Sequence, residues 1–382
     1  MKICYVFSAS QSVYHFMEGQ LDFMDSKGVS ITIAIPDDGM FEDVVKKYPF
    51  ASVVKTPIIR KINLIIDFYT LLFFIQFFIK QKFSIIHLHT PKAGLLGGLS
   101  SRICFCKNII FHLHGLVSVK GGVLENGITN KMEKLSMSLA HKVISVSPSM
   151  AKFCIDNRLV HPDKISVIFN GSINGIDYEN RFNYLNTVSG ALSLRNVLGL
   201  KDKFIIGFLG RVNEDKGLND IVLVFKFLLA KYPNVHLCLV GESELELNLN
   251  SFLNSKIGCS YTVVDKVTNP QDYLSMFDLL LYPSKREGFG LALAEAAALK
   301  TPSVAYNIFG VSDVVQAKVT GQLVPYNDVQ ALTKAVEEYI DDPVLLSNHG
   351  DNAHNYIVQN FKREDIWCAQ YKLYQALCRD SL

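Results

Sequence analysis

Short apolar runs alternate with longer amphipathic segments along the whole chain. In the first half, the runs that we expect to form buried strands are 2–7, 30–35, 85–88, 109–112, 142–146 and 165–169. In the second half they are 204–208, 236–240, 261–264, 279–282 and 302–306. Helical patterns such as 218–230 and 291–299 lie between them. A parallel sheet that is covered by helices on both faces has this alternation. The pattern therefore predicts an α/β protein with doubly wound sheets.

The length of the chain predicts two domains. Its 382 residues exceed one ordinary domain, and 49% of them are hydrophobic, which is enough for two cores. The segment 177–201 is polar and shows no sustained period, so we expect the domains to be 1–180 and 200–361. The last segment, 355–382, has a helical pattern.

Charge is distributed unevenly between the two halves. Residues 1–185 hold 20 Lys and Arg against 14 Asp and Glu, whereas the remainder holds 18 against 22. A basic first half favours an anionic acceptor or an anionic membrane surface, and no motif of nucleic-acid recognition accompanies it. The eight cysteines show no paired spacing, and the amino end lacks the pattern of a signal peptide. We expect a cytoplasmic protein that does not bind nucleic acid.

The apolar segment 58–83 is nearly long enough to cross a bilayer, but Asn63, Asp67 and Gln76 would make a span costly. Helical spacing places Asp67 and Thr70 on a polar face. That face continues through Phe74, Phe77 or Phe78, Lys80 and Lys82. If it points outward, aromatic rings beside lysines suit insertion into a headgroup layer, which predicts monotopic membrane contact. The alternative is an ordinary helix with a wide buried face.

Two carboxylates mark the candidate chemistry of the second half. Glu287 lies in the loop after the strand 279–282, and Glu295 lies in the second turn of the helix that follows. Amides at the start of a helix point outward and favour anions. Because a carboxylate accepts hydroxyl groups well, the pair suits a polyhydroxylated ligand with an anionic centre. An acidic residue on a solvated helix face is the alternative for Glu295.

A basic loop, 210–217, follows the apolar run 204–209 and precedes a helical pattern. It carries Arg211 and Lys216, and ligands of α/β sheets bind at this end of a strand. Arginine suits bidentate phosphate contact and lysine adds a point charge. Taken alone, such a loop is more often solvated surface.

Together, the loop 210–217 and the Glu287–Glu295 pair resemble the donor site of retaining glycosyltransferase family 4. The resemblance covers nearly the whole chain and is most specific from 207 to 327. It implies the GT-B fold, in which two Rossmann-like domains face each other across a cleft. It also implies that the tail 362–382 crosses back to the first domain, where Trp367 is a plausible anchor. The enzyme so implied is a hexosyltransferase that uses a nucleotide sugar.

The resemblance also implies a role for each site residue. Glu287 would contact the transferred sugar, Glu295 would hold the ribose, and Arg211 and Lys216 would neutralise the diphosphate. The remaining residues of the implied donor site are Val267 against the base, Phe289, and Gly290 and Leu291 with backbone amides.

Four histidines, His87, His89, His112 and His114, follow strands of the first half. Alternation sends the first two to one side and the last two to another, and their apolar spacing argues against a metal site, so we expect no metal. The segment 89–94 resembles the corresponding segment of the family branch that extends undecaprenyl-diphosphate-linked sugars. That likeness places His114 near the reacting carbon and Lys92 at the lipid diphosphate. A structural lysine at a helix start is the alternative for Lys92.

The chain departs from the family pattern at several places. The first loop lacks paired glycines, Gly241-Glu-Ser-Glu stands where many members have Gly-x-Gly, and no Asp-x-Asp occurs. We therefore expect no cofactor and no divalent metal. The chain looks most like O-antigen enzymes that move N-acetylgalactosamine from UDP-GalNAc to a lipid-linked sugar at the inner face of the cytoplasmic membrane. The alternatives are a GT-B sugar-nucleotide epimerase and a non-catalytic sugar-nucleotide binding protein.

Overall fold

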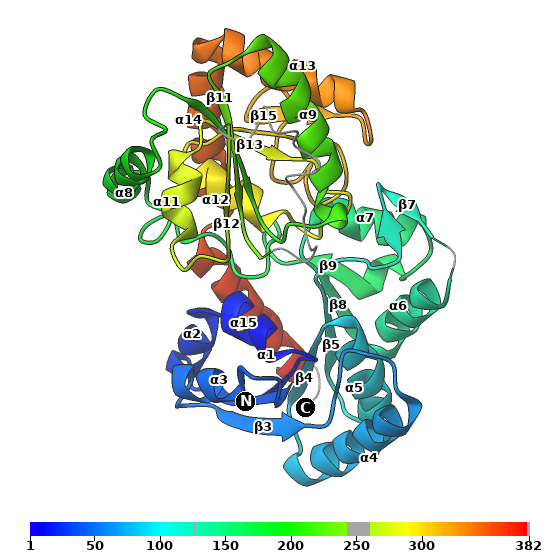
Figure 1. Cartoon of the computed structure of the whole chain (residues 1–382). Helices are drawn as coiled ribbons and strands as arrows, with labels where there is room; N and C mark the ends of the chain where they lie inside the picture. The colour runs from blue at the N-terminus through cyan, green and yellow to red at the C-terminus, as the bar shows by residue number, and fades with distance from the viewer. Residues whose placement is uncertain (126, 243–259, 380–382) are drawn as a thin grey trace. The chain divides into compact units, whose positions relative to one another are not determined.

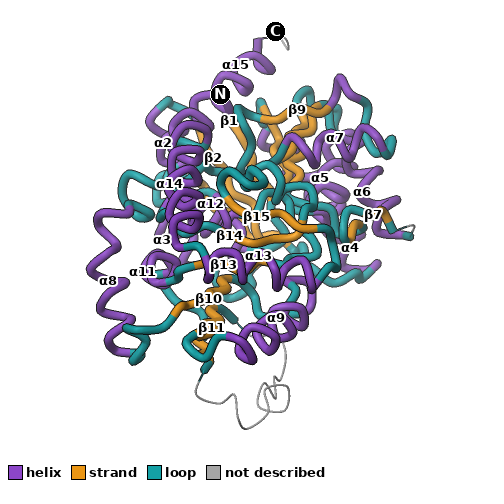
Figure 2. The backbone as a smooth tube through the Cα atoms, turned by 90° about the horizontal axis from the view of Figure 1, so that it is seen from above, coloured by secondary structure: helices purple, strands orange, loops and turns teal. Residues whose placement is uncertain are grey.

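The computed structural model describes residues 1–125, 127–242 and 260–379 (Figure 1). The chain forms two compact units. Unit 1 comprises Met1–Val119, Leu124–Gly175 and Arg363–Leu382, and unit 2 comprises Lys120–Val123 and Ile176–Lys362. In each unit the strands form an inner layer with helices outside them (Figure 2).

Unit 1 contains a parallel sheet that has seven strands among the described residues, in the order β3-β2-β1-β4-β5-β8-β9. The strands are β1 (Lys2–Val6), β2 (Ser30–Pro36), β3 (Ser52–Thr56), β4 (Ile85–His89), β5 (Ile109–Leu113), β8 (Lys142–Ser145) and β9 (Ile165–Val167). The helices are α1 (Ser10–Phe16), α2 (Gln20–Ser26), α3 (Phe41–Lys47), α4 (Leu64–Gln81), α5 (Pro91–Ile103), α6 (Ile128–Leu139) and α7 (Pro148–Asp156), with the 3-10 turn η1 (Pro162–Lys164). A short hairpin, β6 (Val119–Lys120) and β7 (Val123–Leu124), follows β5.

Unit 2 contains a second parallel sheet, in the order β12-β11-β10-β13-β14-β15. Its strands are β10 (Phe204–Leu209), β11 (Val235–Val240), β12 (Tyr261–Val264), β13 (Leu279–Tyr282), β14 (Ser303–Tyr306) and β15 (Gly321–Val324). Its helices are α8 (Tyr184–Val197), α9 (Leu218–Lys231), α11 (Pro270–Met276), α12 (Leu291–Ala298), α13 (Val329–Asp341) and α14 (Pro343–Asn360), with the 3-10 turn η2 (Glu214–Lys216). Both sheets are doubly wound, as the alternation of apolar runs predicts.

The C-terminal helix α15 (Arg363–Arg379) belongs to unit 1 and lies beside α2, at the other end of the chain (Figure 1). Trp367 is the anchor there. Its indole Nε1 donates a hydrogen bond of 2.6 Å to Asn174 Oδ1, and its ring packs against Phe23 at 5.8 Å. The buried indole thus finds a polar partner and an aromatic neighbour in the same unit.

Several elements depart from the sequence prediction. The segment 177–201 is not irregular, because it contains α8, whose first turn is capped by the side chain of Asn183. The helix packs on α11 as part of unit 2. The strands β3 and β15 were also missed, because each lies at the edge of its sheet and is only partly buried. Tertiary packing stabilises these elements more than local pattern does.

Candidate active site

The central strands of unit 2 position the candidate donor site. β10 and β13 are neighbours in the sheet, and the strand order reverses between them. The loop 210–217 follows β10 and the loop 283–290 follows β13. Loops that leave the carboxyl ends of strands at such a reversal form the usual ligand site of an open α/β sheet. The two loops that carry Arg211, Lys216 and Glu287 therefore emerge side by side.

The loop 210–217 is built around a short capped turn. The side chain of Asn213 accepts a hydrogen bond of 3.1 Å from the backbone N–H of Lys216. Gly217 then adopts a φ of 78°, which glycine takes without strain. A Cβ at this position would lie 2.1 Å from the carbonyl oxygen of Pro283. Only glycine allows the loop to approach its neighbour so closely.

Further contacts tie the two loops together. The carbonyl oxygen of Asp215 accepts a hydrogen bond of 2.8 Å from the N–H of Lys285. The carboxylate of Asp215 pairs with the guanidinium of Arg286 at 2.5 Å. Gly121, at the tip of the β6–β7 hairpin, donates from its N–H to Lys285 O at 2.8 Å. These contacts fix the backbone of the loops 210–217 and 283–290 relative to each other.

Lys216 and Glu287 form an ion pair at the centre of this site. Lys216 Nζ lies 2.5 Å from Glu287 Oε1 and 3.2 Å from the hydroxyl of Tyr282. The two charged side chains are only 17% and 10% exposed. Burial by itself lowers the pKa of Lys216, but Glu287 and Tyr282 outweigh it and raise the pKa above its ordinary value. Lys216 is therefore a charged group in a site that is largely dehydrated.

The start of helix α12 carries the next group of donor-site candidates. Gly290 forms its N-cap with a φ of 82°, so Leu291 and the first-turn amides follow directly after the loop. Glu295 is half-buried in the second turn. The side chain of Phe289 is buried against Phe361 at 5.1 Å, which leaves only its backbone for a ligand.

The other two donor-site candidates lie on nearby loops of unit 2. Arg211 is exposed on the loop 210–217. Val267 is half-buried on the loop between β12 and α11. The structure therefore brings Lys216 and Glu287 into contact, with Arg211 on the lysine's loop and Glu295 on the next helix.

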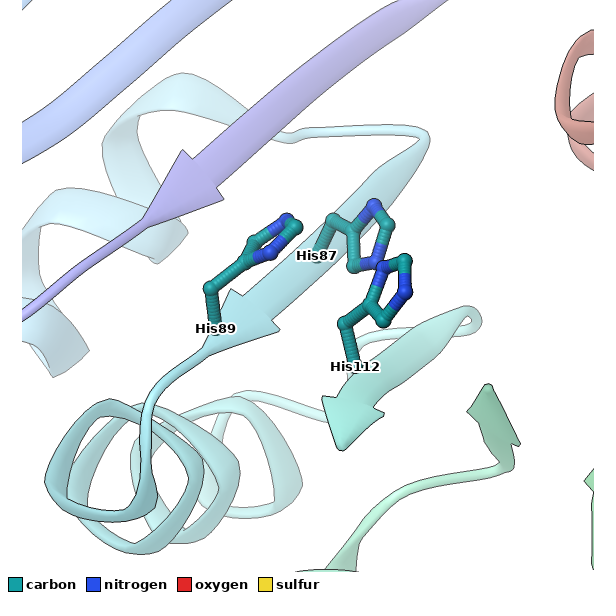
Figure 3. A group of neighbouring side chains, drawn as sticks. All are labelled: His87, His89 and His112. Carbon is teal, nitrogen blue, oxygen red and sulfur yellow. The ribbon is translucent and has the colours of Figure 1, made fainter. Parts of the chain in front are cut away.

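In unit 1 the four histidines form one stacked cluster (Figure 3 shows three of them). The rings of His87 and His112 are 5.3 Å apart and those of His112 and His114 are 4.8 Å apart. The prediction that the two pairs lie on different sides was wrong. β4 and β5 are parallel neighbours in which His89 is paired with His112, and paired residues of adjacent strands point to the same face.

The histidine cluster is neutral. Burial lowers the pKa of His87 and of His114 to about 3, and it lowers those of His89 and His112 well below the ordinary value. Ring nitrogens of His87, His89 and His112 lie within 4.8 Å of one another. These are N ligands of the kind that bind zinc, but a divalent cation there would be a buried charge with no carboxylate among the three grouped ligands.

Two hydrogen bonds order the ends of this cluster. Tyr374 of α15 bonds to His87 Nδ1 at 2.6 Å. His89 Nδ1 bonds to His114 Nε2 at 3.0 Å, so His89 orients the histidine that resemblance places at the reacting carbon. Because the pKa of His114 is so low, this ring is a neutral hydrogen-bonding group at physiological pH.

Lys92 occupies the start of α5 but already has protein partners. Its ammonium lies 2.6 Å from the carboxylate of Asp67 and donates to Lys61 O at 2.5 Å. The side chain is only 10% exposed. These contacts favour the structural alternative, in which Lys92 ties α4 to α5, over contact with a lipid diphosphate.

The orientation of α4 is the reverse of the predicted one. Thr70, Phe74 and Phe78 are buried, and Asp67 pairs with Lys92 of α5, so the predicted outward face is the inward one. The opposite face is apolar and exposed. It consists of Leu64, Ile65, Phe68, Tyr69, Leu72 and Ile79, and we call it the α4 apolar face. By length and composition α4 is also the one described helix that could cross a membrane.

Comparison with known proteins identifies the family. The model of the glycosyl transferases group 1 matches residues 193–356, and that of glycosyltransferase family 4 matches residues 16–172. The capsular polysaccharide biosynthesis glycosyltransferase CapM of Staphylococcus aureus is 30% identical over all of this chain and 98% of its own length. The chain is a group 1/family 4 glycosyltransferase.

Other relatives and solved structures agree with this assignment. A UDP-Gal:alpha-D-GlcNAc-diphosphoundecaprenol alpha-1,3-galactosyltransferase of Escherichia coli is 25% identical over 90% of this chain and 88% of its own. Among solved structures, Anabaena HepE in complex with UDP has a TM-score of 0.79 at 20% identity, covering 98% of this chain and all of HepE. A sucrose-phosphate synthase from Thermosynechococcus elongatus reaches 0.80 at 21% identity, covering 99% of each chain. These structures show that the glycosyltransferase has the GT-B fold.

Sequence reasoning missed three residues that position the candidate site residues. Tyr282 and Asn213 hold Lys216, and His89 holds His114. The spacing of Asn213 and Lys216 is that of an N-cap and its third residue, which was a usable signal. Tyr282 carried no such signal, because a tyrosine that ends an apolar strand reads as core.

Proposed function

We propose that this glycosyltransferase moves a hexose or N-acetylhexosamine from a UDP-sugar to an undecaprenyl-diphosphate-linked sugar, with retention of configuration, in the synthesis of a surface polysaccharide. The observation that carries the proposal is the contact between Lys216 and Glu287 at the reversal point of the unit 2 sheet. It joins a cation that suits a diphosphate to a carboxylate that suits sugar hydroxyls.

The relatives support the substrate classes. The Escherichia coli relative transfers galactose from UDP-Gal to a GlcNAc on diphosphoundecaprenol, and CapM acts in capsule synthesis. Anabaena HepE binds UDP. We propose UDP-GalNAc as the donor and an O-antigen or capsule precursor as the product, with UDP-Gal as the second donor to test.

The proposed reaction needs no group beyond the chain and its two substrates. The bond between the sugar C1 and the diphosphate oxygen breaks, and the acceptor oxygen bonds to C1 from the same face. The proton of the acceptor hydroxyl passes to the leaving UDP. Arg211, Lys216 and the first-turn amides of α12, including those of Gly290 and Leu291, stabilise the diphosphate as its charge grows.

The other site residues hold the substrates in place in this proposal. Glu287 accepts hydroxyls of the transferred sugar, Glu295 holds the ribose, and Val267 lies against the base. His114 acts as a neutral hydrogen-bonding group at the reacting sugar, in accord with its low pKa. Lys92 is left out of the acceptor site, since Asp67 already engages it.

The proposal places the enzyme at the inner face of the cytoplasmic membrane through α4. The α4 apolar face extends from Leu64 to Leu72, with Leu64, Ile65 and Phe68 between 62% and 83% exposed, and Ile79 follows beyond Gln76. Arg60, Lys61, Lys80 and Lys82 are exposed at its two ends. Apolar side chains that are flanked by cations are typical of helices lying in the headgroup layer.

Vesicle flotation tests this surface. We expect the wild type to float with vesicles of phosphatidylglycerol and phosphatidylethanolamine, and we expect the triple variant Ile65→Ser, Phe68→Ser and Leu72→Ser to float several-fold less. A matched control changes three exposed apolar residues of α8: Leu185, Leu192 and Val197 to serine. Equal flotation of the wild type and the α4 variant would contradict the assignment.

A substrate panel tests the reaction. Purified protein is incubated with UDP-GalNAc, UDP-Gal, UDP-GlcNAc and UDP-Glc, with and without an undecaprenyl-diphosphate-linked sugar, and each mixture is run with and without EDTA. We expect transfer only when the lipid acceptor is present, and the same rate in EDTA, because cationic side chains and helix amides face the diphosphate. Epimerised nucleotide sugar without acceptor would favour the epimerase, and binding without any turnover would favour the binding protein. Loss of activity in EDTA that magnesium or manganese restores would contradict the metal-free account.

A further inference from the structure

Three side chains of unit 2 meet at one point where the donor diphosphate is proposed to bind. Lys216 contacts both Glu287, at 2.5 Å, and the hydroxyl of Tyr282, at 3.2 Å. Tyr282 is only 3% exposed, and its ring stacks on Phe208 at 5.8 Å. The ammonium group also lies 5.5 Å from the centre of the tyrosine ring. Lys216 therefore has one charged partner and one neutral partner.

The backbone around these side chains has little freedom to move. Asn213 caps the turn that ends in Lys216, and Gly217 lies against the carbonyl of Pro283. The ion pair of Asp215 with Arg286 joins the same two loops. A ligand that takes over Lys216 must therefore draw away its side chain rather than its loop.

We propose that Lys216, Tyr282 and Glu287 act as a latch, in which Glu287 holds Lys216 until a donor diphosphate replaces it, and in which Tyr282 is the residue that positions Lys216 in both states. This inference rests on the proposed use of a UDP-sugar. A buried carboxylate that loses its cation must gain other hydrogen-bond donors. Hydroxyls of the donor sugar are donors of this kind.

The latch separates the complete donor from its product. A UDP-sugar offers a diphosphate to Lys216 and hydroxyls to Glu287, so both members of the pair are satisfied. UDP offers the diphosphate alone and leaves Glu287 buried without its cation and without sugar hydroxyls, with the Tyr282 hydroxyl as its remaining partner. Glu287 consequently disfavours UDP, and after transfer it recaptures Lys216 as UDP leaves. Discrimination of this type comes from the polar group that the wrong ligand leaves unpaired.

Tyr282 is a neutral hydrogen-bond partner of Lys216 and does not compete with the diphosphate for its charge. Burial, and then the nearby Glu287 carboxylate, raise the pKa of Tyr282, so the phenol stays neutral. Its oxygen accepts a hydrogen bond from Lys216. Because the ring is packed on Phe208, this oxygen has a fixed position. It gives the lysine a partner that remains when Glu287 is exchanged for a diphosphate.

Calorimetry with UDP and with UDP-GalNAc tests the latch. In Glu287→Gln the amide can no longer hold Lys216 by charge, so we expect UDP to bind about tenfold more tightly than to the wild type, the size of one charge-assisted hydrogen bond. The affinity for UDP-GalNAc should change less, so the preference of the wild type for the complete donor should shrink. Turnover should fall in the same variant, because the sugar loses its carboxylate.

Tyr282→Phe tests the positioning role. We expect the KM for the donor and the Kd for UDP to rise severalfold, with a smaller change in kcat. The matched control is Tyr339→Phe, which removes the hydroxyl that bonds to His349 at another buried tyrosine of unit 2. Loss of thermal stability in both variants, with unchanged donor KM in Tyr282→Phe, would mean that Tyr282 is only structural and would overturn its role.

The outcomes distinguish the latch from the proposed function. If the wild type binds UDP and turns over a UDP-sugar, but Glu287→Gln binds UDP equally or more weakly, the latch is wrong and the function stands. If the wild type binds no UDP at all, both are wrong.

Discussion

Between pH 6.5 and pH 4 the protein should lose several kcal/mol of unfolding free energy because of its buried histidines. His87, His89 and His112 are 0 to 2% exposed, and their pKa values are lowered by burial, to about 3 for His87. In the unfolded chain the same groups titrate near the ordinary value of 6.5. Below this pH the unfolded state binds more protons than the folded state. The stabilisation is thus complete above 6.5 and decreases as the pH falls toward 3.

The expected slope is about 1.4 kcal/mol per pH unit for each such histidine. Carboxylates add their own dependence, so the measurement compares the wild type with His112→Leu, by urea unfolding at pH 7, 6, 5 and 4. Neither ring nitrogen of His112 has a hydrogen-bond partner. The leucine substitution should therefore cost little unfolding free energy at pH 7. It should reduce the slope of unfolding free energy against pH by the contribution of one histidine. His161→Gln, at an exposed histidine, is the control. An equal slope in the wild type and His112→Leu would contradict the buried, neutral state.

Replacing Lys216 with methionine should damage binding and stability by separable routes. The side chain is 17% exposed and pairs with Glu287, so its removal leaves a mostly buried carboxylate without its cation. A loss of about 3 kcal/mol of unfolding free energy is expected for breaking such a pair from one side. UDP affinity should also fall by more than tenfold, the size of a lost charge-assisted contact to phosphate.

The double variant Lys216→Met with Glu287→Gln separates these two effects. It removes both charges, so most of the lost stability should return, while UDP should still bind more weakly than to Glu287→Gln alone. Arg211→Ala is the complement, because Arg211 is exposed: UDP affinity should fall with little change in unfolding free energy. Calorimetry with UDP and chemical unfolding of these variants, the wild type and Glu287→Gln provide the measurement. A double variant that binds UDP as tightly as Glu287→Gln alone would exclude Lys216 from the diphosphate site.

The local pattern of this chain was enough to predict its α/β class, most of its strands and the junction that carries Glu287 and Glu295. Buried parallel strands are short apolar runs, and glycines mark the loops that follow them, so both features can be recognised over a few neighbouring residues. The motif spacing also led to the family that the comparisons show. These are properties that one strand and the following helix carry alone.

Tertiary structure decided everything that depends on partners distant in the sequence. Asp67 reads as solvent-facing until Lys92 is placed against it, and this contact turns the apolar face of α4 outward. His89 and His112 share a face only because β4 and β5 are paired in that register. Lys216 and Glu287, 71 residues apart, meet because β10 and β13 are neighbours in the sheet. Periodicity gives the direction of a side chain relative to its own element, whereas the partner it meets depends on how the elements pack.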